Sequence, residues 1–153
     1  MVDYSKFDKK VDLAALQSDI ENAPKQEYEN VPKGTYIVGI ENMEVSETKA
    51  GDKLKFTAEF VVKEGQFKGR KMWFHRVIYG NTSPKWTDAQ AIKSIITWLG
   101  ELGTETEPEF VNYQDFAECV LDIFQEVQNK VELEIYYDAY KFDPVKINEV
   151  FDL

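Results

Sequence analysis

The sequence predicts a mainly β domain with helices, of the α+β class. Three consecutive segments alternate apolar and polar side chains with the two-residue period of half-buried strands, and short glycine-containing turns separate them. The period then changes to that of amphipathic helices, and the last part of the chain alternates again. A chain of 153 residues is long enough for one domain with a proper core.

Residues 1–30 are predicted to form a helix over 12–23 and a polar linker, ahead of a single domain over 31–153. Asp12 is a suitable N-cap for this helix, and Pro24 lies just beyond its end. The apolar face of the helix consists of Leu13, Leu16 and Ile20.

Three strands are expected next, at 35–45, 53–62 and 71–79. The turns between them contain Gly51 and Gly65 and are short, which predicts an antiparallel meander. The apolar faces of the second and third strands consist of Leu54, Phe56, Ala58, Phe60 and Val62, and of Met72, Phe74 and Ile78.

Two amphipathic helices are expected after the meander, at 86–102 and 113–128. Thr87 and Gln90 have the spacing of a capping box at the start of the first helix, and Gly103 follows its end. Together these helices form a helical insertion over 86–128.

Two final strands are expected at 131–137 and 142–151, and Pro144 makes the second an edge strand. The terminal acidic and apolar residues also resemble the tails of single-strand binders, with a last strand as the alternative. The complete order matches the OB-fold, a five-stranded Greek-key barrel whose second and third strands bind oligonucleotides. An open α+β sandwich would share this order.

The net charge of −10 is distributed unevenly along the chain. Residues 1–30 carry −3, residues 31–100 carry +4, and residues 101–153 carry −11. Charges more than about 8 Å apart are largely screened at physiological salt. A local basic groove is therefore compatible with an acidic chain.

The sequence indicates no catalytic, metal or cofactor site. His75 and Cys119 are the only histidine and cysteine, too few for a usual zinc site. We interpret Cys119 as a buried thiol and His75 as a sheet or ligand-contact residue rather than a catalytic base. Three alternating acids are interpreted as a solvated linker rather than a metal or glycosidase site: Glu105, Glu107 and Glu109.

Basic and aromatic side chains accumulate between residues 49 and 86, and single-strand binders need both, for phosphates and for stacked bases. The residues predicted to contact DNA are Lys49, Lys53, Lys55, Arg70, Lys71, Trp73, His75, Arg76 and Trp86. By alternation along its strand, Arg76 falls on the same side as the apolar residues. This predicts either a bulge in the strand or a position at the barrel mouth. The alternative is that Trp73 packs under the helices and the lysines are ordinary solvated charges.

Four motifs occur in order: the leading acidic helix, Pro32-Lys33-Gly34-Thr35-Tyr36, Thr48-Lys49-Ala50-Gly51, and Gly65 to Arg70 with its Gly-x-x-x-Gly-Arg pattern. Over roughly residues 10–100 the chain resembles a family of phage proteins, long catalogued as a domain of unknown function, that look like OB-fold single-stranded DNA-binding proteins. The acidic insertion from Glu101 to Gln128 departs from that pattern.

The resemblance implies binding of single-stranded DNA without strong sequence preference during phage replication or recombination. It implies phage recombinase or replication proteins as partners, and leaves homo-oligomerisation open. The single cysteine, with no apolar leader or membrane-length segment, predicts a location in the host cytoplasm and no membrane contact. The alternative function is an acidic module that recruits or inhibits a replication or recombination protein.

Overall fold

The computed structural model describes residues 5–9, 12–22 and 31–153. Helix α1 (Ser5–Asp8), which the sequence analysis did not predict, and helix α2 (Leu13–Asn22) come first. The side chain of Asp12 accepts hydrogen bonds from the backbone N–H groups of Ala14 and Ala15, so the predicted N-cap is confirmed. The predicted linker lies outside the described residues.

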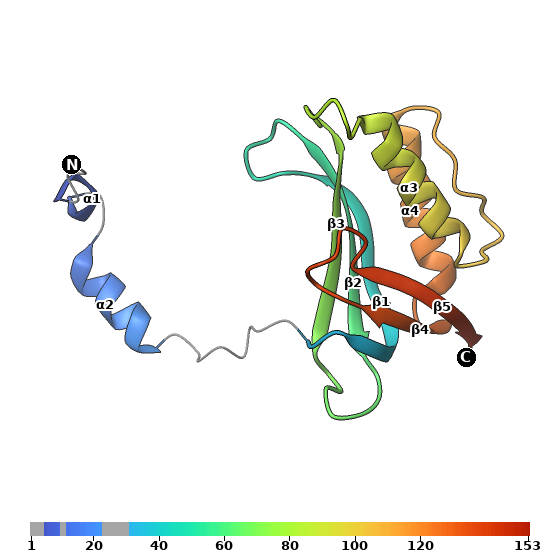
Figure 1. Ribbon diagram of the computed structural model, residues 1–153, viewed down its shortest axis with the longest axis horizontal. Helices are drawn as coiled ribbons and strands as arrows, with labels where there is room; N and C mark the ends of the chain where they lie inside the picture. Colours follow the sequence, from blue (N-terminus) through green and yellow to red (C-terminus); the bar gives the residue numbers. More distant parts are fainter. Residues whose placement is uncertain (1–4, 10–11, 23–30) are drawn as a thin grey trace.

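The main body of the molecule is a five-stranded antiparallel sheet with two helices on one face (Figure 1). Its strand order is β3-β2-β1-β4-β5, so the first three strands form the predicted meander. The strands are β1 (Gly34–Glu47), β2 (Leu54–Val62), β3 (Lys71–Tyr79), β4 (Val131–Tyr137) and β5 (Val145–Asp152). The α+β class is therefore confirmed.

Helices α3 (Asp88–Gly100) and α4 (Tyr113–Val127) lie between β3 and β4 in the sequence, where the helical insertion was expected. Thr87 and Gln90 form the capping box: the Gln90 backbone N–H donates to Thr87 Oγ1, and the Thr87 backbone N–H donates to Gln90 Oε1. Helix α3 packs against β3, and α4 packs against β1. None of the helices in the described parts of the chain is long and apolar enough to cross a membrane.

The core lies between the sheet and the two helices. All five strands contribute residues to it, and in β3 every second residue does so, with Met72, Phe74, Arg76 and Ile78 buried. Trp98 of α3 meets the edges of three core rings, Phe56, Phe60 and Phe74, with ring centroids 5.5–6.0 Å apart. The other face of β3 is therefore free to carry polar and aromatic side chains.

The end of the chain is a strand rather than a tail. Asp152 pairs with Val131, and the backbone N–H of Leu153 donates to the carbonyl of Lys130. Strand β5 begins directly after Pro144 and lies at the edge of the sheet, as predicted.

The sheet is open, so the predicted closed OB-fold barrel is not confirmed. Strands β3 and β5 are its two edges, and no backbone pairing joins them although both are fully described. We call the gap between them the seam. Side chains occupy it: Arg76 enters from β3, Trp98 from α3, and the β4–β5 loop (residues 138–144) crosses it. Side-chain hydrogen bonds, rather than a backbone ladder, therefore connect β3 and α3 to the loop and to the start of β5.

Arg76 is the main connection across the seam. Its guanidinium donates to Ser94 Oγ of α3 (2.8 Å), to the backbone carbonyl of Phe142 (2.7 Å) and to Asp143 Oδ1 (2.8 Å). The rings of Phe74, Phe142 and Trp86 lie 4.2–5.5 Å from the guanidinium carbon, within cation–π range. One side chain thereby joins β3, α3 and the β4–β5 loop.

We expect Arg76→Ala to lower the free energy of unfolding by about 3 kcal/mol, because it leaves a part-buried carbonyl and a part-buried hydroxyl without their donor and opens a cavity. Asp143→Ala should cost less, since Arg76 would keep its other two partners. Urea denaturation followed by tryptophan fluorescence measures both changes.

The control is Lys71→Ala, which removes an exposed ion pair with Glu59 and should change stability by less than about 1 kcal/mol. Equal losses for Arg76→Ala and Lys71→Ala would contradict the role assigned to Arg76.

Candidate nucleic-acid interface

The outer face of β2 and β3 carries the central part of the predicted site. Because side chains alternate along a strand, Trp73, His75 and Tyr79 all point away from the core, and Lys55 lies beside them on β2. Trp73 is 46% exposed, so it is not packed beneath the helices. The structure thus places Trp73, His75 and Lys55 on one surface.

Trp73 and His75 form one wall of a hollow of about 360 Å³, and the β4–β5 loop forms the other wall. The loop contributes Lys141, Phe142 and Pro144. Trp73 and His75 are two residues apart on a strand, so their side chains are separated by about 7 Å. An aromatic ring, an imidazole and a lysine therefore surround one concave surface.

His75 is held in place from β2. Its Nδ1 lies 3.0 Å from Thr57 Oγ1, the residue opposite it in the register. Burial lowers the pKa of His75 below its ordinary value of 6.5, and the positive charge of nearby Lys55 lowers it further. At neutral pH the imidazole is therefore uncharged.

Lys53 and Tyr79 lie at the end of β2 and β3 that is next to the β1–β2 turn. They line a second hollow of about 320 Å³ together with acidic residues of that turn and Tyr113. The Tyr113 ring meets the Tyr79 ring edge to face, with centroids 5.6 Å apart. Lys49 is exposed in the same turn. At this end, two predicted lysines therefore lie near Tyr79, an aromatic residue that was not among the predicted contacts.

Arg70 and Lys71 lie at the opposite end of β2 and β3, where the β2–β3 turn leads into β3. Lys71 is exposed, and its ammonium group is 3.1 Å from the Glu59 carboxylate. Glu44 of β1 is opposite Thr57 on the same outer face. The face is therefore mixed in charge rather than uniformly basic.

Arg76 and Trp86 belong to the seam and not to the outer face. Arg76 is 6% exposed, and each of its contacts uses the guanidinium that a phosphate would need. The irregularity in the β2–β3 register falls after Val77, so no bulge turns Arg76 outward. The Trp86 ring packs edge to face on Phe142 at 4.7 Å. Both residues support the β4–β5 loop.

The sequence analysis did not select this loop. Tyr140 is 94% exposed and Phe142 is 62% exposed, and Lys141 between them lines the hollow beside Trp73. The sequence contains the aromatic–basic–aromatic run Tyr140-Lys141-Phe142 just ahead of Asp143 and Pro144. Only Phe142 was assigned to a strand, at 142–151, and neither ring was considered as a contact.

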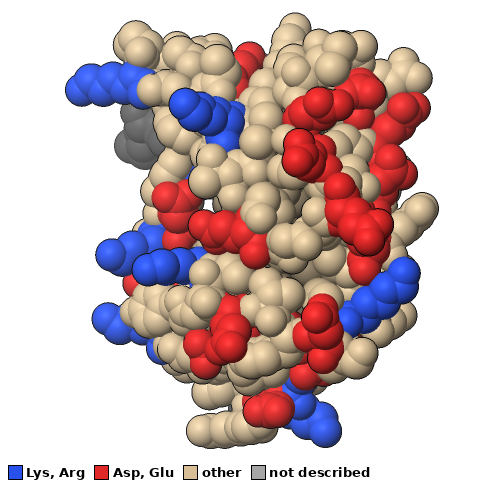
Figure 2. Space-filling view, turned by 90° about the vertical axis from the view of Figure 1, so that its right-hand side faces the viewer, with Lys and Arg blue, Asp and Glu red and all other residues tan. Residues whose placement is uncertain are grey.

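The side of the molecule formed by α3, α4 and β5 is predominantly acidic. Figure 2 shows Asp and Glu side chains spread over this side, with most of the visible Lys and Arg side chains along its left margin. Cys119 is buried there, with Sγ 3.6 Å from the Glu107 carbonyl. Within the described residues, no group of three His, Cys, Asp or Glu side chains is arranged to hold a metal ion.

A family model described as a protein of unknown function (DUF669) matches residues 18–152. No curated protein and no solved structure gives a significant match. The matched region includes every strand of the sheet and both helices that cover it. The chain belongs to the DUF669 family.

Proposed function

We propose that this protein binds single-stranded DNA on the outer face of β2 and β3, between the β1–β2 turn and the β4–β5 loop. The observation that carries the proposal is the exposed ring of Trp73, which lies in a hollow next to His75 and Lys141. The indole is half exposed in a concave surface. Covering it with a flat apolar partner is favourable, because this removes apolar surface from water. An unpaired base is such a partner, and the adjacent ammonium group of Lys141 suits its phosphate.

The DNA strand would cross the outer face of β2 and β3 from the Lys53–Tyr79 hollow to the β4–β5 loop. Bases would stack on Tyr79, Trp73 and Tyr140, since each exposes a ring at the surface. Phosphates would contact Lys53, Lys55 and Lys141, which flank those rings. Each stacked base contributes on the order of 1–3 kcal/mol, and the phosphate contacts add affinity that falls with salt.

Rings and lysines do not distinguish one base from another, because every base has a stacking face and every nucleotide a phosphate. Arg76, one of the two arginines predicted to contact DNA, is occupied in the seam. We therefore propose binding without strong sequence preference, in DNA replication or recombination of a phage, in the host cytoplasm. Pairing β3 with β5 would turn this sheet into a five-stranded barrel, so we interpret the fold as an open variant of the OB-fold.

We expect Trp73→Ala to weaken binding of an oligo-dT strand by about 5- to 150-fold, the loss of one stacked base. Leu121→Ala is the matched control: Leu121 is 45% exposed but lies on α4, on the acidic side. Fluorescence anisotropy of a labelled strand at several salt concentrations measures both.

The salt dependence of the affinity distinguishes phosphate contacts from base stacking. Lys55→Ala should reduce the slope of log affinity against log salt by about 0.7, the contribution of one phosphate contact on a single strand, and Trp73→Ala should leave the slope unchanged. Absence of oligo-dT binding at low salt, or equal losses for Trp73→Ala and Leu121→Ala, would refute the proposed function.

Binding should strengthen as the pH falls below 6.5, because a phosphate beside His75 favours the imidazolium that burial and Lys55 disfavour in the free protein. The pKa of His75 would therefore rise on binding, and the imidazole would take up a proton when the complex forms. In His75→Gln this pH dependence should disappear while affinity at pH 8 changes little. A titration series between pH 5 and 8 tests this, and an unchanged pH dependence in His75→Gln would exclude His75 as a phosphate contact.

A second candidate function is recruitment of a phage recombinase or replication protein through the acidic side. The supporting observation is that Leu121 and Val111 are exposed among its acids, at 45% and 69%. Leu121→Ala combined with Val111→Ser should abolish capture of such a protein and leave oligo-dT binding intact. Loss of DNA binding with unchanged capture would reject this assignment.

A further inference from the structure

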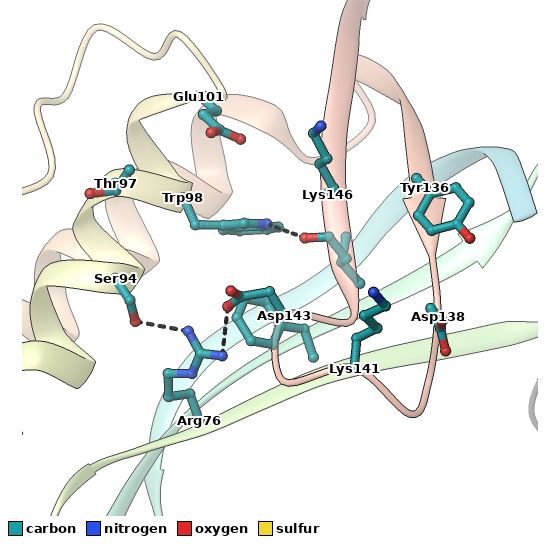
Figure 3. Close-up of a pocket in the computed structure, with 12 residues that line it drawn as sticks. Arg76, Ser94, Thr97, Trp98, Glu101, Tyr136, Asp138, Lys141, Asp143 and Lys146 are labelled. Carbon is teal, nitrogen blue, oxygen red and sulfur yellow. Dashed lines mark hydrogen bonds and ion pairs between the residues drawn. The ribbon is translucent and has the colours of Figure 1, made fainter. Parts of the chain in front are cut away.

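The seam contains a cavity of about 500 Å³ that is separate from the outer face of β3. It lies between β3, α3, the β4–β5 loop and the start of β5 (Figure 3). Lys141 lines both this cavity and the hollow beside Trp73, so the loop alone divides the two. A volume of this size accommodates a small organic ligand.

The wall of the cavity formed by α3 and the strands is aromatic and rigid. Trp98, Phe74 and Val145 contribute its apolar surface. The indole N–H of Trp98 donates to the Val145 carbonyl at 3.2 Å, and the edge contacts with core rings fix the indole plane. A preformed aromatic surface of this kind favours a flat ring as the ligand.

An added peptide strand would compete with a hydrogen bond that already exists at the start of β5. Such a strand would need the backbone groups of the β3 or β5 edge. The carbonyls of Phe142 and Val145 face the cavity side, and they already accept hydrogen bonds from Arg76 and Trp98. A strand would have to displace both donors, whereas a compact ring would not.

The rim carries charges of both signs. Lys141 and Lys146 stand on one side of the opening, and the carboxylate of Glu101 lies on the helix side across from Lys146 (Figure 3). The Asp143 carboxylate is neutralised by Arg76. Two ammonium groups suit one phosphate, and the remaining carboxylates of Glu101 and Asp138 disfavour a polyanion that would need several.

We propose that the seam cavity binds a single nucleotide, with its base against Trp98 and its phosphate at Lys141 and Lys146. The nucleotide comes either from the DNA strand bound on the neighbouring face, in which case the inference rests on the proposed function, or from the free pool. The shared chemistry is a flat heterocyclic ring joined to one phosphate.

The indole N–H signals in a proton–nitrogen correlation spectrum of the full chain report on this cavity. The chain has three tryptophans, and Trp73→Phe and Trp86→Phe assign the third signal to Trp98. We expect dCMP to shift the Trp98 signal saturably, and 2-deoxyribose 5-phosphate, which lacks the base, to leave it unchanged. An eight-residue oligo-dC strand distinguishes a strand nucleotide from a free one.

Thr97→Phe should block the cavity without disturbing the core, because Thr97 lines it yet is exposed on α3. We expect it to weaken the dCMP response by at least about tenfold, and Lys146→Glu to weaken it several-fold. The matched control is Gln125→Phe, an exposed helix position on α4 outside the cavity lining, which should respond as the unmodified chain does.

The outcomes separate this inference from the proposed function. A Trp98 shift with dCMP but no binding of oligo-dT would support nucleotide binding in the seam cavity and refute DNA binding on the outer face. Suppose instead that oligo-dT binding depends on Trp73 and that neither dCMP nor oligo-dC changes the Trp98 signal. This result would support DNA binding on the outer face and overturn nucleotide binding in the cavity. A shift with dCMP that Thr97→Phe leaves intact would also overturn it, as would an equal shift with 2-deoxyribose 5-phosphate.

Discussion

The contacts of Arg76 across the seam determine how the two edges of the sheet are arranged. A guanidinium buried to this extent is tolerated only because a hydroxyl, a carbonyl, a carboxylate and surrounding rings share its charge. With these partners, the β4–β5 loop is held at β3 by a side chain instead of a backbone ladder. The hollow beside Trp73 and the seam cavity both depend on that position, since the loop forms a wall of each.

Local rules were sufficient for the five strands, for helices α2 to α4 and for their order, although they missed helix α1. The limits of β3 and β4 agree with the alternation of apolar residues, and the capping box at Thr87 forms as predicted. Closure of the barrel was not predictable in this way. Whether β3 pairs with β5 depends on what lies between them. Trp98 and Arg76 lie there, and their partners Val145 and Phe142 are far from them in the sequence.

The candidate site was predictable where it follows from strand parity. Trp73 and His75 had to lie opposite Phe74, so their exposure followed once the strand was recognised. Arg76 has the parity of the core, and the structure places it there because three hydrogen-bond partners from two other elements are available. The exposed loop rings of Tyr140 and Phe142 were missed because loop conformation does not follow a sequence period.

The separation of charge along the chain is also a separation in space. An acidic side behind a mixed, lysine-bearing face gives the molecule a strong electric dipole moment. Near any polyanion, this moment would rotate the protein during diffusion so that its helical side turns away before contact. Productive collisions would then be more frequent than random orientation allows, and dissolved salt would slow the encounter even where it left the final complex intact.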